Sequence, residues 1–429
     1  CKNAHGLSVL GFEKRGFKTI VAPAENRSFK DSPCILCGQC VSVCPTGALM
    51  EVSEIEKVDE AMKAGKYVVV QTAPAVRAAL GEEFGMPVGT LVTGKMVAAL
   101  RRLGFKKVFD TNFAADLTIM EEATELLHRM KTGGTLPMIT SCSPGWVNYC
   151  EYYYGDLLPH LSSCKSPHEM FGAILKSYYC EKTGIDPRDM FVVSIMPCTA
   201  KKYEKERPQL QKEGIKDVDA VLTTRELGKL IKRSGIRFDK LPEEQFDNDV
   251  VGEYTGAGVI FGVTGGVMEA ALRTAIYTVT GKEPEKAELT EVRGFKGVRE
   301  AAYDLNGTKV KIAVAHGMKN AKVLLDDIRA GKSEYQFIEI MGCPGGCIAG
   351  GGQPYVRPCF LPNEGTDILD TYKEKRAAAL YKEDESKTYR FSHRNPQIIE
   401  LYKEYLGEPN SHKAHELLHT TYEIGRAHV

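Results

Sequence analysis

The chain has 429 residues, of which 43% are hydrophobic, so it is long enough for two or more domains with cores of their own. Basic and acidic residues both number 56, and this balance gives no argument for a nucleic-acid or membrane-surface partner. No apolar run of about 18 residues predicts a membrane-spanning helix. The 13 cysteines are an odd number and several are clustered, which favours metal thiolates in a reducing, cytoplasmic compartment over disulfides.

The first cysteine cluster is CILCGQCVSVCP (34–45), which reads C-x2-C-x2-C-x3-C-P. This is the spacing of bacterial ferredoxins, in which three cysteines hold one 4Fe–4S cubane and the fourth ligates the other cluster. We therefore expect Cys34, Cys37 and Cys40 to share a cubane and Cys44 to belong to a second one. Zinc is the main alternative, but zinc sites usually pair two separated C-x2-C units.

The cubane of the 34–45 run needs one more ligand. Cys1 is the natural candidate, as the last cysteine of a preceding run. The other ligands of the Cys44 cluster would then lie before residue 1. We expect residues 1–55 to be a ferredoxin-like domain that is truncated at its N-terminus.

After this segment, short apolar runs alternate with helix-like sequence. The expected strands are at 66–74, 107–110, 136–141, 190–198, 259–262, 310–317 and 335–343, with a strand followed by a helix within 218–235. The expected helices are at 75–85, 112–134, 265–275 and 318–331. This alternation predicts a two-lobed α/β domain with mostly parallel sheets over residues 56–356. The charged, helix-prone sequence of 357–429 predicts an appended helical tail.

Three of these strands deliver a cysteine at their C-terminal ends, namely Cys142, Cys198 and Cys343. In open α/β sheets, ligands bind at that edge. Behind the third strand, EIMGCPGGCIAGGGQP (339–354) adds Cys347, which has glycines at 345, 346 and 350–352 around it. Backbone without a Cβ atom can crowd a metal cluster and offer it N–H groups.

These loops carry a family resemblance. TSCSPGWV (140–147), MPCTAKK (196–202) and EIMGCPGGCIAGGGQP (339–354) resemble, in this order, the three signature loops of the iron-only (FeFe) hydrogenases. The similarity extends through 118–127 and 252–273. It implies a hydrogenase that interconverts H2 with protons and electrons at an H-cluster, in which a 4Fe–4S cubane shares one cysteine thiolate with a two-iron unit carrying CO, cyanide and a dithiolate amine.

By motif, the resemblance makes Cys198, Cys343 and Cys347 cubane ligands, with Cys347 shared between the two parts of the cluster. Lys201 would donate to a cyanide. The residues expected to bind the cofactor by contact are Met196, Pro197, Phe261, Met341, Gly345 and Gly346.

One loop departs from the family, which usually has two adjacent cysteines where this chain has Cys142 and Ser143. In strict register Cys142 is the proton-relay thiol and Ser143 occupies the position of the fourth cubane ligand. A serine oxygen is a harder iron ligand than a thiolate. Three alternatives remain open: Ser143 ligates, the loop shifts so that Cys142 ligates, or the nearby Cys164 compensates.

The resemblance also implies a proton path from Cys142 through Glu122, Ser162 and Glu125 to water. Glu122 and Glu125 are three residues apart on one expected helix, hence on the same face. Burial would raise a carboxyl pKa toward neutrality, which suits proton transfer. From composition alone, a solvated helix face is the more common explanation of such a pair.

Electrons would pass through the cluster of Cys34 to a ferredoxin-type carrier. The chain has no G-x-G-x-x-G fingerprint, so any NAD- or formate-linked chemistry would belong to partner subunits. Maturation proteins would assemble the H-cluster. Two other functions remain possible: a sensory H-cluster protein of low turnover, and a cubane-only electron-transfer or iron–sulfur assembly protein.

Other features suggest no separate activity. HELLH (415–419) fits the zinc-protease motif H-E-x-x-H, but an amphipathic helix is the better interpretation because no third ligand is evident. Cys150, Cys180 and Cys359 are isolated and are expected to be buried structural thiols. Trp146 is expected to pack in the core.

Overall fold

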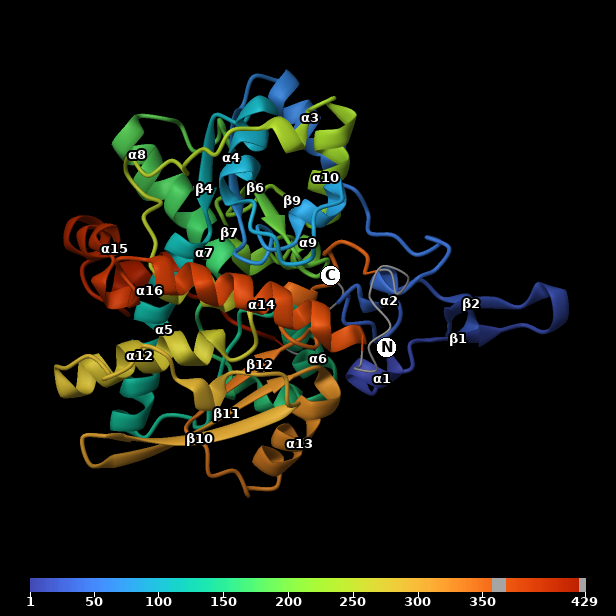
Figure 1. Ribbon diagram of the computed structural model, residues 1–429. Coiled ribbons are helices and arrows are strands. Elements are labelled where there is room, and N and C mark those ends of the chain that lie inside the picture. The colour runs from blue at the N-terminus through green and yellow to red at the C-terminus, as the bar shows by residue number, and fades with distance from the viewer. Residues whose placement is uncertain (357–367, 424–429) are drawn as a thin grey trace.

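The computed structural model describes residues 1–356 and 368–423, which form two α/β lobes, a small N-terminal segment and a C-terminal helical segment (Figure 1). Each lobe contains one four-stranded sheet, and the pairings in these two sheets are parallel except for one. The predicted α/β class with mostly parallel sheets is therefore confirmed. Among the described residues, no helix is both long and apolar enough to cross a membrane.

The first sheet is parallel throughout, with the strand order β4-β3-β6-β9. Its strands are β3 (Tyr67–Thr72), β4 (Lys107–Asp110), β6 (Met190–Met196) and β9 (Ala220–Thr223). Val70 pairs with Val108 on one side and with Val193 on the other, and all three are buried. Helices cover both faces of such a sheet, which is why its strands read as continuous apolar runs.

The helices of this lobe are α3 (Ile55–Lys63), α4 (Thr93–Arg102), α7 (Pro167–Ile174), α8 (Cys180–Thr183), α9 (Lys201–Glu204) and α10 (Thr224–Arg233), with a small ribbon of β7 (Gln211–Lys212) and β8 (Ile215–Lys216). The start of α10 follows directly from its sequence. Thr223 and Glu226 form a reciprocal capping box, which satisfies two otherwise unpaired backbone N–H groups at the helix start.

The second sheet has the order β10-β11-β12-β5. Its strands are β5 (Met138–Ile139), β10 (Val298–Leu305), β11 (Thr308–His316) and β12 (Phe337–Met341), and its neighbouring helices are α6 (Pro144–Tyr153), α11 (Gly256–Val259), α12 (Gly266–Thr280) and α13 (Met318–Arg329). β10 is an antiparallel edge strand that our sequence reasoning missed. Asn306 and Gly307, both at positive φ, form its turn, and this Asn-Gly dipeptide was an available hairpin signal.

Helix α5 (Asn112–Thr132) joins the two lobes. It begins directly after β4, packs against both α7 and α12, and ends at Gly133 with φ 74°, as the sequence predicted. Its middle is buried although it carries Asp116, Glu121, Glu122 and Glu125. Carboxyl groups are almost never buried without partners, so this helix is a candidate for function rather than only for stability.

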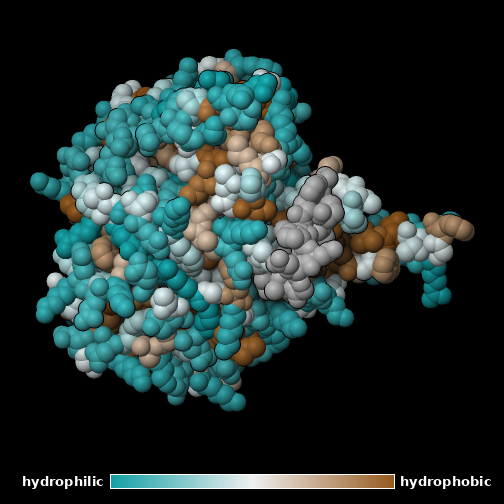
Figure 2. All heavy atoms as spheres, viewed as in Figure 1, coloured by the Kyte–Doolittle hydropathy of each residue, from teal (hydrophilic) through white to brown (hydrophobic). Residues whose placement is uncertain are grey.

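The N-terminal segment extends from the side of the two lobes (Figure 1). It contains α1 (Lys2–His5), a hairpin of β1 (Leu10–Glu13) and β2 (Ile20–Pro23), and α2 (Gln39–Ser42). The hairpin projects from the body and exposes apolar side chains, among them Phe12, Phe17 and Val21. Figure 2 shows brown, hydrophobic atoms on this projection. Exposed apolar surface of this kind is typical of a contact with another domain or partner.

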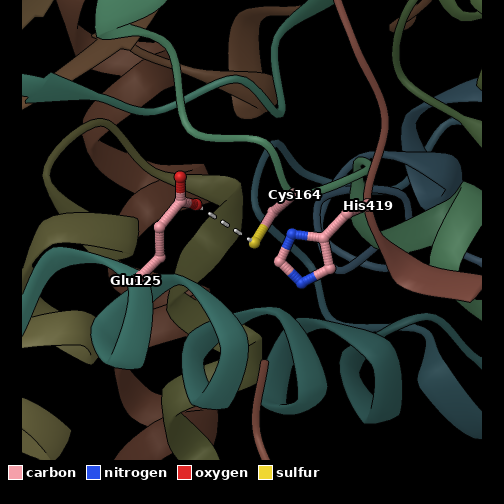
Figure 3. A group of neighbouring side chains, drawn as sticks. All are labelled: Glu125, Cys164 and His419. Carbon is pink, nitrogen blue, oxygen red and sulfur yellow. Dashed lines mark hydrogen bonds between the residues drawn. The ribbon is translucent and has the colours of Figure 1, made fainter. Parts of the chain in front are cut away.

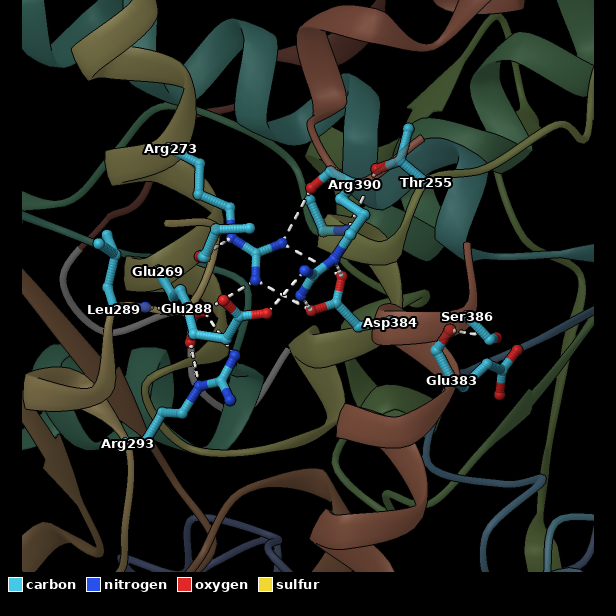
Figure 4. Close-up of polar contacts among 12 residues, drawn as sticks. Thr255, Glu269, Arg273, Glu288, Leu289, Arg293, Glu383, Asp384, Ser386 and Arg390 are labelled. Atoms are coloured by element: carbon cyan, nitrogen blue, oxygen red, sulfur yellow. Dashed lines mark hydrogen bonds and ion pairs between the residues drawn. The ribbon is translucent and has the colours of Figure 1, made fainter. Parts of the chain in front are cut away.

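The predicted C-terminal helical tail is confirmed, and the structure adds that it is part of the core. Its helices are α14 (Ile368–Ser386), α15 (Pro396–Leu401) and α16 (His412–Leu418), and Leu380, Leu401 and Leu418 are buried among residues of the two lobes. Figure 4 shows the ion pairs that attach α14 to α12. Asp384 accepts hydrogen bonds from Arg273 (3.0 Å) and Arg390 (2.7 Å).

Two local predictions were wrong. Residues 75–85 were expected to be a helix but form turns and a short 3-10 helix (Leu80–Phe84). Here the Arg77 side chain turns inward to the buried Asp110 at 2.7 Å, and this tertiary ion pair outweighs local helix propensity. Residues 259–262 were expected to be a strand but end α11 and form a 3-10 turn, where a Cβ on Gly262 would lie 2.5 Å from Leu380.

Three of the isolated residues are buried, as we expected from the sequence. Cys150, Cys180 and Trp146 are buried, and the Trp146 indole donates to the Thr140 carbonyl. The HELLH sequence lies on α16 and its end. Cys359 lies outside the described residues.

Candidate metal centre and its proton path

The three strand-end loops meet around one buried cavity between the two lobes. The predicted residues that line it are Cys142, Ser143, Met196, Pro197, Cys198, Lys201, Phe261, Met341, Cys343, Gly346 and Cys347. The structure thus brings together residues from β5, β6 and β12 as expected from parallel strands whose carboxyl ends face one cleft. Gly345 is not among the lining residues of the cavity.

The cavity contains an unusual concentration of soft donors. Four cysteine sulfurs and the thioethers of Met196 and Met341 line it. Such a set suits iron–sulfur chemistry better than it suits a hard cation such as Mg²⁺ or Ca²⁺. The residues present therefore fit a sulfur-ligated iron cluster.

Burial controls the protonation of these thiols. It raises the pKa of Cys347 to about 12 and raises that of Cys198 and Cys343 as well. The free thiols consequently hold their protons at neutral pH, and a metal that binds must displace them. Insertion of a cluster into this cavity would therefore release protons.

The turn behind Cys343 is closed by glycines that no other residue could replace. A Cβ atom on Gly346 (φ 94°) would lie 2.6 Å from the Thr264 backbone nitrogen, and one on Gly350 would lie 2.0 Å from the Pro197 carbonyl oxygen. The turn is therefore pressed flat against the loop that carries Cys198. This close backbone contact brings Cys343, Cys347 and Cys198 to one wall.

Cys142 and Ser143 both line the cavity, but they face different neighbours. Burial raises the pKa of the Cys142 thiol most strongly, and the nearby charge of Glu122 raises it further. The Ser143 hydroxyl instead accepts a hydrogen bond from the Gly342 backbone N–H at 3.0 Å, directly beside Cys343. The thiol is thus near α5 and the hydroxyl is near the glycine-rich turn.

Lys201 places a cation beside the cavity. Its Nζ donates to the Glu204 carboxylate (2.8 Å), the Ser166 hydroxyl (3.0 Å) and the Cys142 carbonyl (3.4 Å). Burial opposes the charge, but Glu204 and the nearby Cys198 outweigh this effect and hold the pKa of Lys201 above its usual value. His168, which sequence reasoning missed, also lines the cavity and is hydrogen-bonded to Glu204 at 2.7 Å.

The predicted proton-path residues lie close to one another on and beside α5. Burial, followed by the charge of Glu125, raises the pKa of Glu122 to about 8, and its Oε2 has no hydrogen-bond partner. Ser162 donates to Glu125 Oε2 at 2.9 Å. Arg129, one turn further along α5, donates to Glu125 Oε1 at 2.6 Å and is partly exposed. The sequence signal for Arg129 was its i+4 spacing from Glu125.

The C-terminal segment closes over this region (Figure 3). His419 is within hydrogen-bond distance of Ser163 through Nδ1 (2.8 Å) and of Glu121 through Nε2 (3.0 Å). The Cys164 sulfur lies between His419 and Glu125, 3.9 Å from Glu125 Oε2 (Figure 3). Cys164 does not line the cavity, so its position does not support the alternative in which it replaces a cubane ligand.

The ferredoxin-like loop packs backbone-to-backbone against the glycine-rich turn. A Cβ atom on Gly351 would lie 2.1 Å from the Cys37 carbonyl oxygen. Thr199 donates to the Leu36 carbonyl at 2.7 Å, and Gln39 donates to the Ala349 carbonyl at 2.9 Å. No flexible side chain separates the two cysteine-bearing loops at this contact.

The five cysteines of the N-terminal segment are not gathered at one point. Cys34 and Cys40 line one surface hollow, and burial raises the pKa of Cys37 to about 12. Cys1 is exposed and lines a different hollow, and Cys44 is partly exposed. Next to Cys37 lies His5, which the sequence reasoning did not consider: its Nε2 is 3.3 Å from the Cys37 sulfur.

Comparison with known families covers almost the entire chain. Residues 66–351 match the family described as iron only hydrogenase large subunit, C-terminal domain. Residues 370–424 match the iron hydrogenase small subunit family, and residues 30–50 match the 4Fe-4S binding domain.

Individual relatives are similar over most of their length. The chain is 51% identical to the NADP-reducing hydrogenase subunit HndD of Solidesulfovibrio fructosivorans, over 98% of this chain and 71% of that protein. It is 47% identical to iron hydrogenase 1 of Clostridium pasteurianum (99% and 73%) and 54% identical to the periplasmic Fe hydrogenase large subunit of Nitratidesulfovibrio vulgaris (76% and 85%). A more distant relative, 31% identical over 94% of this chain and 88% of that protein, is the protein NAR1 of Arabidopsis thaliana.

Solved structures agree with these relatives. A structure of HydA that describes stepwise FeFe-hydrogenase H-cluster assembly has a TM-score of 0.75 and 44% identity, covering 87% of this chain and 100% of that one. A second, which describes FeFe-hydrogenase oxygen inactivation at the H-cluster, has a TM-score of 0.76 and 42% identity over the same shares.

Proposed function

Because this chain belongs to the iron-only hydrogenase family, we propose that the strand-end cavity holds the cubane of the H-cluster on Cys198, Cys343 and Cys347. The chain is a hydrogenase that interconverts H2 with protons and electrons. When bound, the H-cluster supplies the iron chemistry that forms and breaks the H–H bond. The protein supplies the ligands, a dry cavity, a route for protons and a route for electrons.

Ser143 holds the position of the fourth cubane ligand and Cys142 is the relay thiol. The support is the direction in which each side chain lies: Ser143 Oγ is beside Gly342 and Cys343, whereas Cys142 lies where Glu122 affects its pKa. A serine oxygen binds iron less readily than a thiolate, so we expect this corner of the cluster to be the easiest to lose.

Protons pass between the cavity and solvent through Cys142, Glu122, Ser162 and Glu125. A carboxyl with a pKa of about 8 can both accept and donate a proton near neutral pH, which is the property a relay needs. Glu125 is the outer member, because Arg129 and Ser162 already hold it in place and Arg129 reaches the surface. Lys201, as a buried cation, orients an anionic ligand of the cofactor.

Electrons leave through the loop of Cys37, which is packed against the glycine-rich turn at Gly351. The final acceptor is a small electron carrier of the ferredoxin type, and the exposed hairpin lies on the same side of the molecule as this loop (Figure 1). One relative is named an NADP-reducing hydrogenase subunit. Since this chain shows no dinucleotide fingerprint, nicotinamide chemistry would require a partner subunit.

One observation carries the proposal: four cysteine thiols from three separate strand ends line a single buried cavity. The test is H2 evolution from reduced methyl viologen by anaerobically matured protein, together with infrared spectra in the region of bound CO and cyanide. Turnover with these bands supports the proposal.

Infrared bands of bound CO and cyanide without appreciable H2 evolution would favour the sensory alternative. The departure from the family at Cys142 and Ser143 is the reason to test it. Absence of the bands in matured protein that contains cubanes would overturn the cofactor assignment in favour of a cubane-only protein. The relation to NAR1, although more distant, makes this control necessary.

A further inference from the structure

We propose that Glu125, Cys164 and His419 form a binding site for a zinc ion at the outer end of the proton path. None of the three lines the cavity of the strand-end cysteines, so this site is separate from the catalytic centre. The effect of zinc on H2 turnover rests on the proposed role of Glu125 in proton transfer, whereas the site itself does not. A zinc ion bound here would stop turnover reversibly.

The three side chains present their ligand atoms to a common point. A Glu125 carboxylate oxygen, the Cys164 sulfur and a His419 ring nitrogen all lie within 4.8 Å of one another, and the three side chains converge in Figure 3. The sulfur is 3.9 Å from Glu125 Oε2. A tetrahedral zinc ion holds a thiolate and a carboxylate oxygen about 3.5 Å apart, so a small closure completes the site and leaves a fourth position for water.

Thiolate, imidazole and carboxylate are the three kinds of side-chain ligand that zinc takes, and one of each is present here. The thiol argues against Mg²⁺ and Ca²⁺, which prefer oxygen ligands only. All three side chains are buried, with 8% of Glu125, 1% of Cys164 and 8% of His419 exposed. The donor set therefore indicates zinc rather than a hard cation.

Hydrogen bonding gives the His419 ring the form that a metal ligand needs. A carboxylate can only accept, so Nε2 carries the ring proton and donates it to Glu121 at 3.0 Å. Nδ1 then has the free lone pair, and it faces the segment of Cys164, since it is 2.8 Å from the Ser163 hydroxyl. A carboxylate on the other ring nitrogen is the usual partner that orients a metal-bound histidine. Glu121 is itself fixed by the Tyr402 hydroxyl.

Backbone pairing holds the two segments of the site together. Cys164 and His419 face each other in an isolated antiparallel bridge. Beside it, the Thr420 N–H donates to the Ser163 carbonyl at 2.7 Å. The ligands come from distant parts of the sequence but are already side by side, so little conformational entropy is lost when a metal binds.

The zinc site and the proton path share one oxygen. Glu125 Oε2 accepts the Ser162 hydroxyl at 2.9 Å and is also the oxygen that faces the Cys164 sulfur. Oε1 is held by Arg129. Zinc on Oε2 takes the lone pair that the relay uses, so proton exchange with Ser162 stops. The Cys164 thiol releases one proton to solvent when zinc binds, and no electron is transferred.

The HELLH sequence contributes only its second histidine. The His415 ring packs against that of His419, with ring centroids 4.0 Å apart, and it is not in the group of ligand atoms found among the described residues. Glu416 forms an ion pair with Lys212 instead. A metalloprotease needs both histidines on one zinc ion and the glutamate as its base. The arrangement therefore supports regulation by zinc and not hydrolysis.

The experiment uses the matured full chain with its iron clusters intact, in buffer without chelators. One equivalent of zinc is added, and X-ray absorption at the zinc K-edge counts the sulfur ligands of the bound ion. We expect one sulfur at about 2.3 Å, with nitrogen and oxygen as the other ligands. In parallel, H2 evolution from reduced methyl viologen is measured against zinc concentration. We expect inhibition that EDTA reverses.

Cys164→Ala removes one ligand and should raise the zinc concentration for half-inhibition at least ~10-fold, with zinc-free turnover unchanged. The matched control is Cys180→Ala, which removes a buried thiol of α8 and should keep wild-type sensitivity. His419→Gln should lower the sensitivity as Cys164→Ala does, and it provides a second variant if the first does not fold. The sulfur count on the wild-type protein needs no variant.

An ion with two or more sulfur ligands would overturn the proposal, because zinc would then be bound by the clustered cysteines. Absence of bound zinc, or equal inhibition of wild type and Cys164→Ala, would overturn it as well. Zinc bound through one sulfur without any effect on H2 evolution would support the site and remove Glu125 from the proton path. The zinc site and the proposed function can therefore fail separately.

Discussion

Glu122 offers the sharpest test of the proton path, because one substitution should affect activity and stability in opposite directions. Burial and the charge of Glu125 raise the Glu122 pKa from 4.5 to about 8, which disfavours the ionised form by about 5 kcal/mol. Glu122→Gln keeps the shape and the neutral state that Glu122 mostly has at pH 7. It removes the ability to release a proton, so we expect H2 evolution to fall at least ~100-fold.

The stability effect has a definite sign. An acid whose folded pKa is raised holds a proton that the unfolded chain releases between about pH 4.5 and pH 8, so the wild-type fold loses stability as pH rises through this window. Glu122→Gln has no such loss. Relative to wild type it should gain about 4 kcal/mol between pH 5 and pH 9. For a chain of this length that is a shift of about 4 °C in the unfolding midpoint.

The assays are viologen-dependent H2 evolution and thermal unfolding under anaerobic conditions at several pH values. Glu121→Gln, one residue earlier on α5 and outside the proposed path, is the matched control for activity. If Glu122→Gln retained wild-type turnover, Glu122 would not be in the path. If the difference in midpoint between variant and wild type did not grow with pH, the argument from burial would be refuted.

Three further predictions concern other parts of the molecule. Asp384→Ala leaves the buried Arg273 with fewer partners and should destabilise the fold by about 3 kcal/mol. The measurement is the unfolding midpoint, which should fall. An unchanged midpoint would contradict the role of this ion pair in attaching α14. Gly351→Ala pushes against the Cys37 carbonyl 2.1 Å away. It should slow H2-driven viologen reduction more than H/D exchange, which needs no electron exit, and equal effects on both would rule out an electron route here. Ser143→Cys should retain the cubane iron at least as well as wild type and Ser143→Ala should lose it, measured as iron per chain; an unchanged iron content in Ser143→Ala would show that this residue is no ligand.

Much of the candidate site could be predicted because its signals are local in sequence. An apolar strand that ends in a cysteine places that cysteine at the carboxyl edge of a sheet, and three such strands of one α/β domain direct their cysteines toward a common region. The cavity residues Cys142, Cys198 and Cys343 were predicted in this way, and Cys347 was predicted from the family resemblance. The helix that carries Glu122 and Glu125 was also predictable, because its length, periodicity and terminal Gly133 all lie within one continuous segment.

The errors arose where distant residues decide the local structure. Residues 75–85 have good helix formers, but Arg77 is drawn to Asp110, and no local pattern records that pair. In the same way, the tail was expected to be appended, whereas Leu418 and His419 pack over the region of α5 that holds the proton path.

By itself, the sequence determined which residue types carry the chemistry and on which loops they lie, because spacing along the chain limits what a turn or strand end can present. Only the tertiary structure decided which way each group faces: Cys142 toward Glu122, Ser143 toward Gly342, and His5 toward Cys37. The physical reason is that side-chain direction and burial are set by packing between segments far apart in the chain, and these contacts leave no periodic trace in the residues themselves.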